Sequence, residues 1–147
     1  MPSAFQPTVI MISHDPLPPL RLLVVDDSRP FRQILERILK PFPSLNLIGE
    51  AADGLSAVEM ALALRPDIIV MDVQMPELDG IEATRRIKTS LSQVCVIGLS
   101  VLDHPMINEA MLAAGASVFV PKFCAVTLPE VIEHVTGRRL ADQETAS

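Results

Sequence analysis

The sequence contains no tryptophan and no tyrosine, and phenylalanine occurs only five times in 147 residues. Aromatic cages and base-stacking platforms made from tryptophan or tyrosine are therefore excluded. Cysteine is also scarce, because only Cys95 and Cys124 occur and they form no C-x-x-C pair. Two isolated thiols in a chain without an export signal favour reduced cysteines and a cytoplasmic location.

Long apolar runs and an excess of positive charge are missing as well. No apolar stretch approaches the roughly 20 residues that span a bilayer. The first residues also lack the basic start and the apolar segment of a secretory signal. The formal net charge of −6 argues against a nucleic-acid surface, which requires a basic patch. We therefore expect neither membrane association nor direct nucleic-acid binding.

The chain length favours one domain with one core, flanked by two short ends. Five prolines among the first 19 residues disfavour regular structure, so residues 1–19 are predicted to form a flexible N-terminal arm. Residues 138–147 are polar and are predicted to form a frayed C-terminal tail. The domain itself is expected to cover residues 20–137.

Between these ends, short apolar runs alternate with helical patterns. Strands are predicted over 22–25, 45–51, 68–71, 94–99 and 118–120, and helices over 31–39, 55–64, 81–90, 107–114 and 128–135. Ser28 is suited to cap the first helix, Thr127 and Glu130 fit a capping box for the last, and Gly137 suits its end. Asp79-Gly80 predicts a turn before the third helix, with no chemical role.

The predicted strands are continuous apolar runs, which are typical of parallel strands covered by helices on both faces. Strands that alternate with helices, joined by right-handed crossovers, form a doubly wound α/β sandwich. In such sheets the functional crevice lies beyond the carboxyl ends of the strands.

Polar side chains follow four of the five predicted strands. The first strand is followed by Asp26 and Asp27, the third by Asp72, the fourth by Ser100 and the fifth, shortly after, by Lys122. These residues are far apart in the sequence, but the predicted topology brings them to one edge of the sheet.

Three neighbouring carboxylates repel one another, and a divalent cation would relieve that repulsion. Mg²⁺ is a hard ion that prefers oxygen ligands, and no cysteine or histidine spacing indicates zinc. Lys122 could neutralise remaining charge and pair with a phosphate, to which the Ser100 hydroxyl could donate. Because a carboxylate can act as a nucleophile, the set predicts phosphoryl transfer through an aspartyl phosphate.

Four segments closely resemble the receiver domains of two-component response regulators. They are VVDDS at 24–28, VMDVQMPELDGIEATRRIK at 70–88, VIGLS at 96–100 and AAGASVFVPK at 113–122. The resemblance covers residues 20–137. It implies a flavodoxin-like (βα)5 sandwich whose parallel sheet has the strand order 2-1-3-4-5.

The resemblance also implies a role for each residue of the cluster. Asp72 matches the phosphoacceptor, and Lys122 matches the counter-charge for the phosphate. The Mg²⁺ ligands of the family match Asp26, Asp27, Asp72 and the backbone carbonyl of Gln74. Ser100 and Phe119 match the switch pair that moves on activation.

By the same resemblance the phosphodonor is a sensor histidine kinase or a histidine phosphotransfer protein, and the output goes to a downstream protein target. The domain is then a signalling switch, monomeric or weakly dimeric, that catalyses only its own phosphorylation and dephosphorylation. Two positions depart from the common pattern. Val101 replaces the usual alanine, which predicts restricted access to the phosphoryl group, and Phe123 replaces a frequent proline.

Besides a stand-alone receiver, three alternatives stay open. The chain could be the receiver of a longer regulator, for example a transcriptional regulator, whose output domain is absent. It could be a phosphatase with aspartyl-phosphate chemistry, although Gln74 stands where such enzymes often carry a second aspartate. It could also be a degenerate receiver that binds partners without phosphorylation.

Overall fold

Five short, mostly apolar strands form a parallel sheet in the computed structural model, which describes residues 17–101 and 104–140. Their order across the sheet is β2-β1-β3-β4-β5, as the family resemblance implies. Every pairing between neighbours is parallel. The strands are β1 (Leu20–Val25), β2 (Leu45–Ala51), β3 (Ile68–Asp72), β4 (Cys95–Ser100) and β5 (Val118–Pro121).

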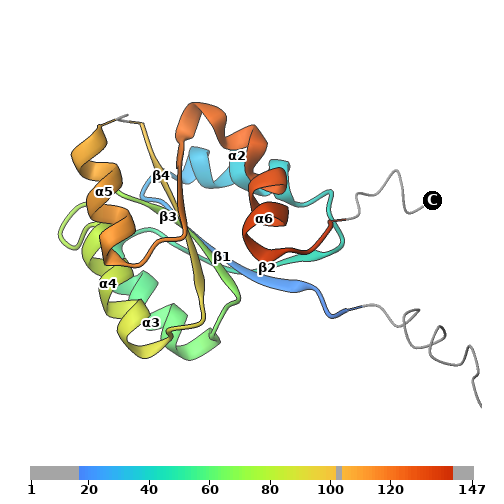
Figure 1. Cartoon of the computed structure of the whole chain (residues 1–147), viewed down its shortest axis with the longest axis horizontal. Coiled ribbons are helices and arrows are strands. Elements are labelled where there is room, and N and C mark those ends of the chain that lie inside the picture. The colour runs from blue at the N-terminus through green and yellow to red at the C-terminus, as the bar shows by residue number, and fades with distance from the viewer. Residues whose placement is uncertain (1–16, 102–103, 141–147) are drawn as a thin grey trace, which may run out of the picture.

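Helices cover both faces of this sheet, which confirms the predicted doubly wound sandwich (Figure 1). They are α2 (Arg29–Leu39), α3 (Gly54–Leu64), α4 (Gly80–Ser90), α5 (Pro105–Ala114) and α6 (Leu128–Thr136), with a 3₁₀ segment η2 (Lys122–Thr127) before the last. Helices α2 and α6 share one buried layer, and α3, α4 and α5 contribute to the other. No helix in the described part of the chain is both long and apolar enough to cross a membrane.

The two core layers explain why the strands read as unbroken apolar runs. Leu22 and Val24 of β1 pack into the layer under α2 and α6, whereas Leu23 and Val25 pack into the opposite layer. All four side chains are at most 1% exposed. Full burial of such a side chain contributes about 1.5–3 kcal/mol to the free energy of unfolding. Exposing either face of the sheet to water would therefore cost much of the stability of the domain.

The predicted helix ends are confirmed at two of the three positions. The Ser28 hydroxyl accepts the Phe31 N–H at 3.3 Å and begins α2, and Gly137 ends α6 with a φ of 71°. The capping box at Thr127 is wrong. Its hydroxyl donates to the Cys124 carbonyl at 2.7 Å, because η2 runs directly into α6 and leaves Thr127 with helical backbone angles.

The first three residues of the predicted tail are held against the domain rather than frayed. Leu140 is only 7% exposed, and its N–H donates to Glu133 Oε2 at 2.7 Å. Arg138 Nη1 donates to the Pro18 carbonyl at 2.8 Å and so joins the two ends of the domain. Most of the predicted arm and the rest of the tail lie outside the described residues.

Candidate functional site

The carboxyl ends of the strands bring the predicted acidic residues together. Asp26 and Asp27 follow β1, Asp72 ends the adjacent β3, and each of the three offers a carboxylate oxygen within 4.8 Å of the others. Ser100 ends β4, which pairs with β3, and Lys122 follows β5 at the same edge of the sheet. The predicted convergence of these five residues is confirmed.

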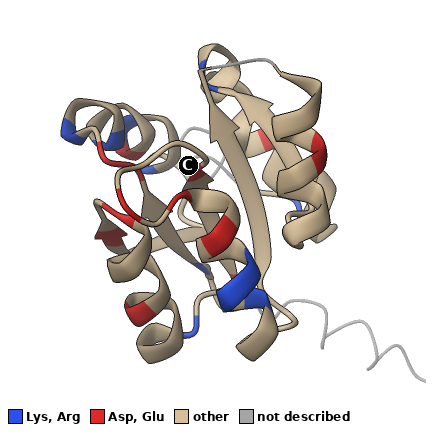
Figure 2. Cartoon of the chain, turned by 90° about the vertical axis from the view of Figure 1, so that its left-hand side faces the viewer, with Lys and Arg blue, Asp and Glu red and all other residues tan. Residues whose placement is uncertain are grey.

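Buried charge distinguishes this cluster from the other charged residues. Figure 2 shows the charged residues mainly on helices and loops, with the central strands largely free of them. Asp26 is fully buried and Asp72 is 2% exposed, whereas Asp27 is exposed. Burying carboxylates is costly unless they are paired, so partners for Asp26 and Asp72 are required.

Lys122 supplies that partner. Its Nζ lies 2.6 Å from Asp26 Oδ2 and 3.5 Å from Asp72 Oδ2, and its side chain is 14% exposed. Asp26 Oδ1 accepts the Ser28 N–H at 2.8 Å. Charge-assisted contacts of this kind hold the two carboxylates and the ammonium in one arrangement.

One ammonium group does not balance three carboxylates. Burial, followed by the negative charge of Asp26, raises the pKa of Asp72 to about 7. The Lys122 charge and the Gln74 N–H, which donates to Asp72 Oδ1 at 3.3 Å, lower that pKa but do not outweigh burial. Three carboxylates with only one lysine to neutralise them are a donor set that fits a hard divalent cation such as Mg²⁺.

Gly80 was predicted only as part of a turn, but it lies directly behind the site. A Cβ at this position would stand 2.0 Å from the Asp72 carbonyl oxygen. The Gly80 N–H donates to the Val73 carbonyl at 2.8 Å, and Asp79 caps α4 by accepting the Glu82 N–H at 2.9 Å. The Asp-Gly pair therefore lets the start of α4 approach the end of β3.

Phe31 begins the helix predicted over 31–39, and its position beside the site was missed. The centroid of its ring lies 4.5 Å from Lys122 Nζ. The sequence held no signal for this contact, because the two residues come from opposite ends of the domain.

The predicted switch pair lies on neighbouring strands. Ser100 is fully buried, and Phe119 on β5 is half-buried opposite Gly98 of β4. A Cβ at Gly98 would meet Met111 Cγ at 2.9 Å and Phe119 Cδ2 at 3.4 Å, so the glycine makes room for both side chains.

The two departures from the family pattern lie at the surface. Val101 is 64% exposed, just beyond the end of β4, and Phe123 is 77% exposed. The peptide bond between Lys122 and Phe123 is trans, as are the others in the described part of the chain. Gln74 is exposed, and its backbone N–H donates to Asp72 Oδ1.

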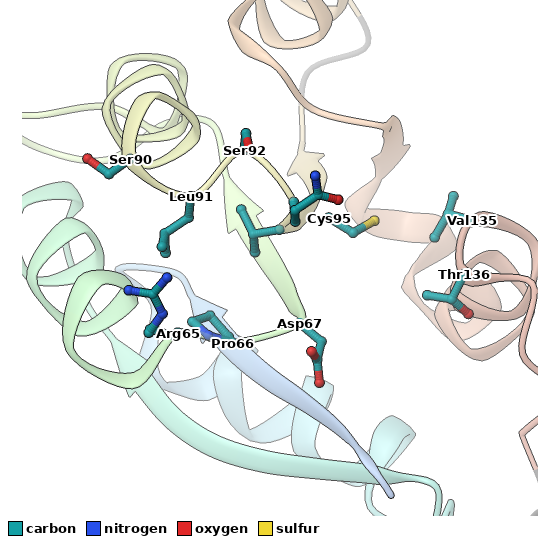
Figure 3. A pocket seen from close by; sticks show the side chains of 11 residues that line it. Arg65, Pro66, Asp67, Ser90, Leu91, Ser92, Cys95, Val135 and Thr136 are labelled. Carbon is teal, nitrogen blue, oxygen red and sulfur yellow. The ribbon is translucent and has the colours of Figure 1, made fainter. Parts of the chain in front are cut away.

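A surface cavity of about 490 Å³ lies at the opposite edge of the sheet (Figure 3). Asp67 and Cys95, at the amino ends of β3 and β4, contribute to its lining together with Thr136 of α6. Asp67 Oδ2 already accepts the Arg21 N–H at 2.8 Å. The cavity gathers no cluster comparable to the carboxylates and is separate from them.

A parallel doubly wound sheet with three acidic residues, a lysine and a buried hydroxyl at its carboxyl edge is the arrangement expected of a receiver domain. Residues 22–135 match the family described as the response regulator receiver domain, and the chain belongs to that family.

Curated relatives and solved structures agree with this assignment. The chain is 40% identical over 125 residues to protein-glutamate methylesterase/protein-glutamine glutaminase 4 of Myxococcus xanthus (strain DK1622), covering 84% of this chain and 35% of that protein. The response regulator domain of Thermotoga maritima CheB is 35% identical, with a TM-score of 0.70 over 81% of this chain and 95% of that one. The signal receiver domain of NarL from Mycobacterium tuberculosis is 30% identical, with a TM-score of 0.74 over 83% of this chain and 100% of that one.

The chain spans about a third of the length of the curated methylesterase relatives that it matches. The likeness to them therefore concerns the receiver part of those proteins.

Proposed function

We propose that this domain is a signalling switch that accepts a phosphoryl group on Asp72 from a sensor histidine kinase or a histidine phosphotransfer protein. The observation that carries the proposal is the position of Lys122 Nζ, which contacts both Asp26 and Asp72 within a buried acidic cluster. A cluster held only for stability would gain little from burying two carboxylates, with a third beside them, around one lysine.

The chemistry follows from these contacts. An Asp72 carboxylate oxygen attacks the phosphorus of a phosphohistidine, a new oxygen–phosphorus bond forms, and the histidine nitrogen leaves with the electron pair of the broken bond. Asp26, Asp27, Asp72 and the Gln74 carbonyl would hold Mg²⁺, which supplies charge neutralisation for the transferred group. Lys122 moves its contact from a carboxylate to a phosphate oxygen.

Ser100 and Phe119 are the proposed switch. The Ser100 hydroxyl, at the end of β4, would follow the new phosphate charge at the end of the neighbouring β3. The half-buried Phe119 ring can then turn inward beside Gly98. Phosphorylation would thus bias a two-state equilibrium that a downstream protein target reads.

Incubation with acetyl phosphate and Mg²⁺, followed by intact-mass measurement, tests the proposal. We expect a mass increase of about 80 Da, that of one phosphoryl group, which disappears in Asp72→Asn. Asp67→Asn is the matched control, because Asp67 lies just before the same strand at the opposite edge of the sheet and should leave the adduct unchanged. A persistent adduct in Asp72→Asn contradicts the assignment.

The methylesterase relatives favour a second, more specific candidate, in which this receiver controls a protein-glutamate methylesterase unit. The same phosphorylation would then act through a neighbouring domain or a separate subunit. Mixing the phosphorylated domain with an isolated methylesterase domain of that family tests this candidate. A change in ester hydrolysis that depends on Asp72 supports it, and identical rates with and without the phosphoryl group contradict it.

Two further interpretations have their own readouts. Multiple turnover on small phosphate esters would support the phosphatase alternative, and failure to bind Mg²⁺ would support a degenerate receiver.

Cys95 and Cys124 are free thiols, which supports the cytoplasm as the predicted compartment.

A further inference from the structure

We propose that Phe31 is a positioning residue, whose aromatic face holds the Lys122 ammonium beside Asp72 for phosphoryl transfer. The inference rests on the proposed function and adds an aromatic residue to the site. Its basis is the distance of 4.5 Å between Lys122 Nζ and the centroid of the Phe31 ring.

The ring is fixed by the same short segment that carries the acidic pair. Ser28 donates its N–H to Asp26 Oδ1 at 2.8 Å and accepts the Phe31 N–H on its hydroxyl at 3.3 Å. Asp26 in turn contacts Lys122 Nζ at 2.6 Å. The start of α2 therefore sets the position of one carboxylate and of one aromatic face around the same ammonium group.

Lysine is a point charge on a flexible stem, and ordering it costs side-chain entropy. The carboxylates of Asp26 and Asp72 attract the Lys122 ammonium, at 2.6 and 3.5 Å. The Phe31 ring adds an attractive surface, because the face of an aromatic ring carries partial negative charge. At a site where the lysine side chain is only 14% exposed, water competes weakly with that attraction.

The ring also differs from the carboxylates in what it demands of the ammonium. A carboxylate oxygen requires a hydrogen bond along a defined direction, whereas the face of a ring attracts the charge as a whole. Lys122 can therefore turn from Asp26 toward a phosphate oxygen on Asp72 without leaving the ring. Phe31 would keep the lysine within reach during this exchange.

The alternative explanation is that Phe31 is only a packing residue, since it also borders the core layer under α2 and α6. Fluorinated phenylalanines separate the two explanations. Successive fluorine atoms withdraw charge from the ring face while its shape changes little, so packing is retained and the attraction for a cation falls.

The decisive experiment places mono-, di- and trifluorophenylalanine at position 31 and measures the rate constant for phosphorylation by acetyl phosphate at saturating Mg²⁺. We expect a stepwise decrease with each fluorine, reaching roughly threefold to tenfold for the trifluoro ring. A rate that does not change along the series, in proteins that remain folded, overturns the proposal.

Conventional variants provide the controls. Phe31→Leu should slow phosphorylation at least as much as the trifluoro ring, and Phe31→Tyr, which keeps an aromatic face, should restore most of the rate. Phe42→Leu is the matched control, because Phe42 is also a half-buried phenylalanine beside the same core layer, away from Lys122. Equal slowing in Phe42→Leu and Phe31→Leu overturns the proposal.

A measurement without phosphorylation distinguishes failure of this inference from failure of the proposed function. In NMR spectra of the unphosphorylated protein, the Lys122 methylene protons next to Nζ should be shifted upfield by the ring current and return in Phe31→Leu. Absence of that shift overturns the contact itself, even where Asp72 is phosphorylated. If the shift is present but the wild-type protein accepts no phosphoryl group, the proposed function fails, and with it the role given to Phe31.

Discussion

Gly80 lies against the main-chain carbonyl of Asp72 so closely that a Cβ at position 80 would stand 2.0 Å from the carbonyl oxygen. The residue with the proposed phosphoacceptor role is thus supported from behind by the first residue of α4. The oxygen belongs to the backbone and cannot turn aside as a long side chain could. A larger side chain at position 80 would therefore push directly against the end of β3.

Gly80→Ala should destabilise the domain and slow phosphorylation, because either α4 or the end of β3 must move. Overpacking of this kind typically costs about 1–3 kcal/mol of unfolding free energy, measurable by urea denaturation. Gly49→Ala is a suitable control, since its new Cβ would meet only side-chain atoms, the nearest being Leu64 Cδ1 at 3.3 Å. Equal effects of the two substitutions would contradict the expected role of the Asp72 carbonyl.

The raised pKa of Asp72 predicts a pH-dependent stability when divalent metal is removed with EDTA. The pKa rises from the ordinary 3.8 to about 7 on folding, so between these values the folded protein keeps a proton that the unfolded chain has lost. The unfolding free energy contributed by this group therefore decreases as the pH rises through that window and stays low above it. Asp72→Asn lacks this titration.

The measurement compares urea denaturation of the wild-type protein and Asp72→Asn between pH 5 and pH 8. We expect the variant to gain stability relative to the wild type over this range, by on the order of 2–3 kcal/mol. Addition of Mg²⁺ should reduce the gain, because the cation stabilises the charged carboxylates of the wild type. A stability difference that is independent of pH would show that Asp72 does not titrate in this window.

Removal of one exposed carboxylate from the cluster should weaken Mg²⁺ binding. Asp27→Asn deletes a negative charge whose ligand atom lies within 4.8 Å of those of Asp26 and Asp72. We expect the dissociation constant for Mg²⁺, measured by isothermal titration calorimetry, to rise at least about tenfold. Glu59→Gln removes the same charge from an exposed position on α3 and should leave the affinity nearly unchanged.

The contacts of residues 138–140 predict that the end of the domain contributes to its stability. Leu140→Ala removes a side chain that is 7% exposed and packed in the layer under α2 and α6. We expect a loss of about 2 kcal/mol in unfolding free energy. Arg139→Ala, at the exposed neighbour, should change stability by less than about 0.5 kcal/mol. Matching losses for the two variants would mean that Leu140 contributes no core packing.

The sequence predicted the fold closely because each element carried its own local signal. The helix from Arg29 to Leu39 has its apolar positions at helical spacing and its cap at Ser28, and both are confirmed. The start of α6 at Leu128 was predicted correctly, but the capping box at Thr127 was wrong because such a box is recognised from two residues alone. The 3₁₀ segment before Thr127 depends on tertiary packing, which the pattern does not contain.

The site could be predicted where polar residues end apolar strands, as at Asp72 and Lys122, because parallel topology determines where strand ends meet. The position of Phe31 beside Lys122 could not be predicted, since an apolar residue on a helix gives the same pattern whether it contacts the core or an ammonium group. Gly80 was assigned to a turn for a similar reason. A close approach to a backbone carbonyl leaves no trace in hydrophobic periodicity.

The hydrogen bond between Arg138 and the Pro18 carbonyl, at 2.8 Å, has a consequence for protein engineering. The chain enters and leaves the domain at nearly the same point, near the amino end of β1. A domain with this geometry can be spliced into a surface loop of a host protein without forcing the two sides of that loop apart. Because Leu140 is buried against the domain, Pro18 and Leu140 are the natural splice points for such an insert.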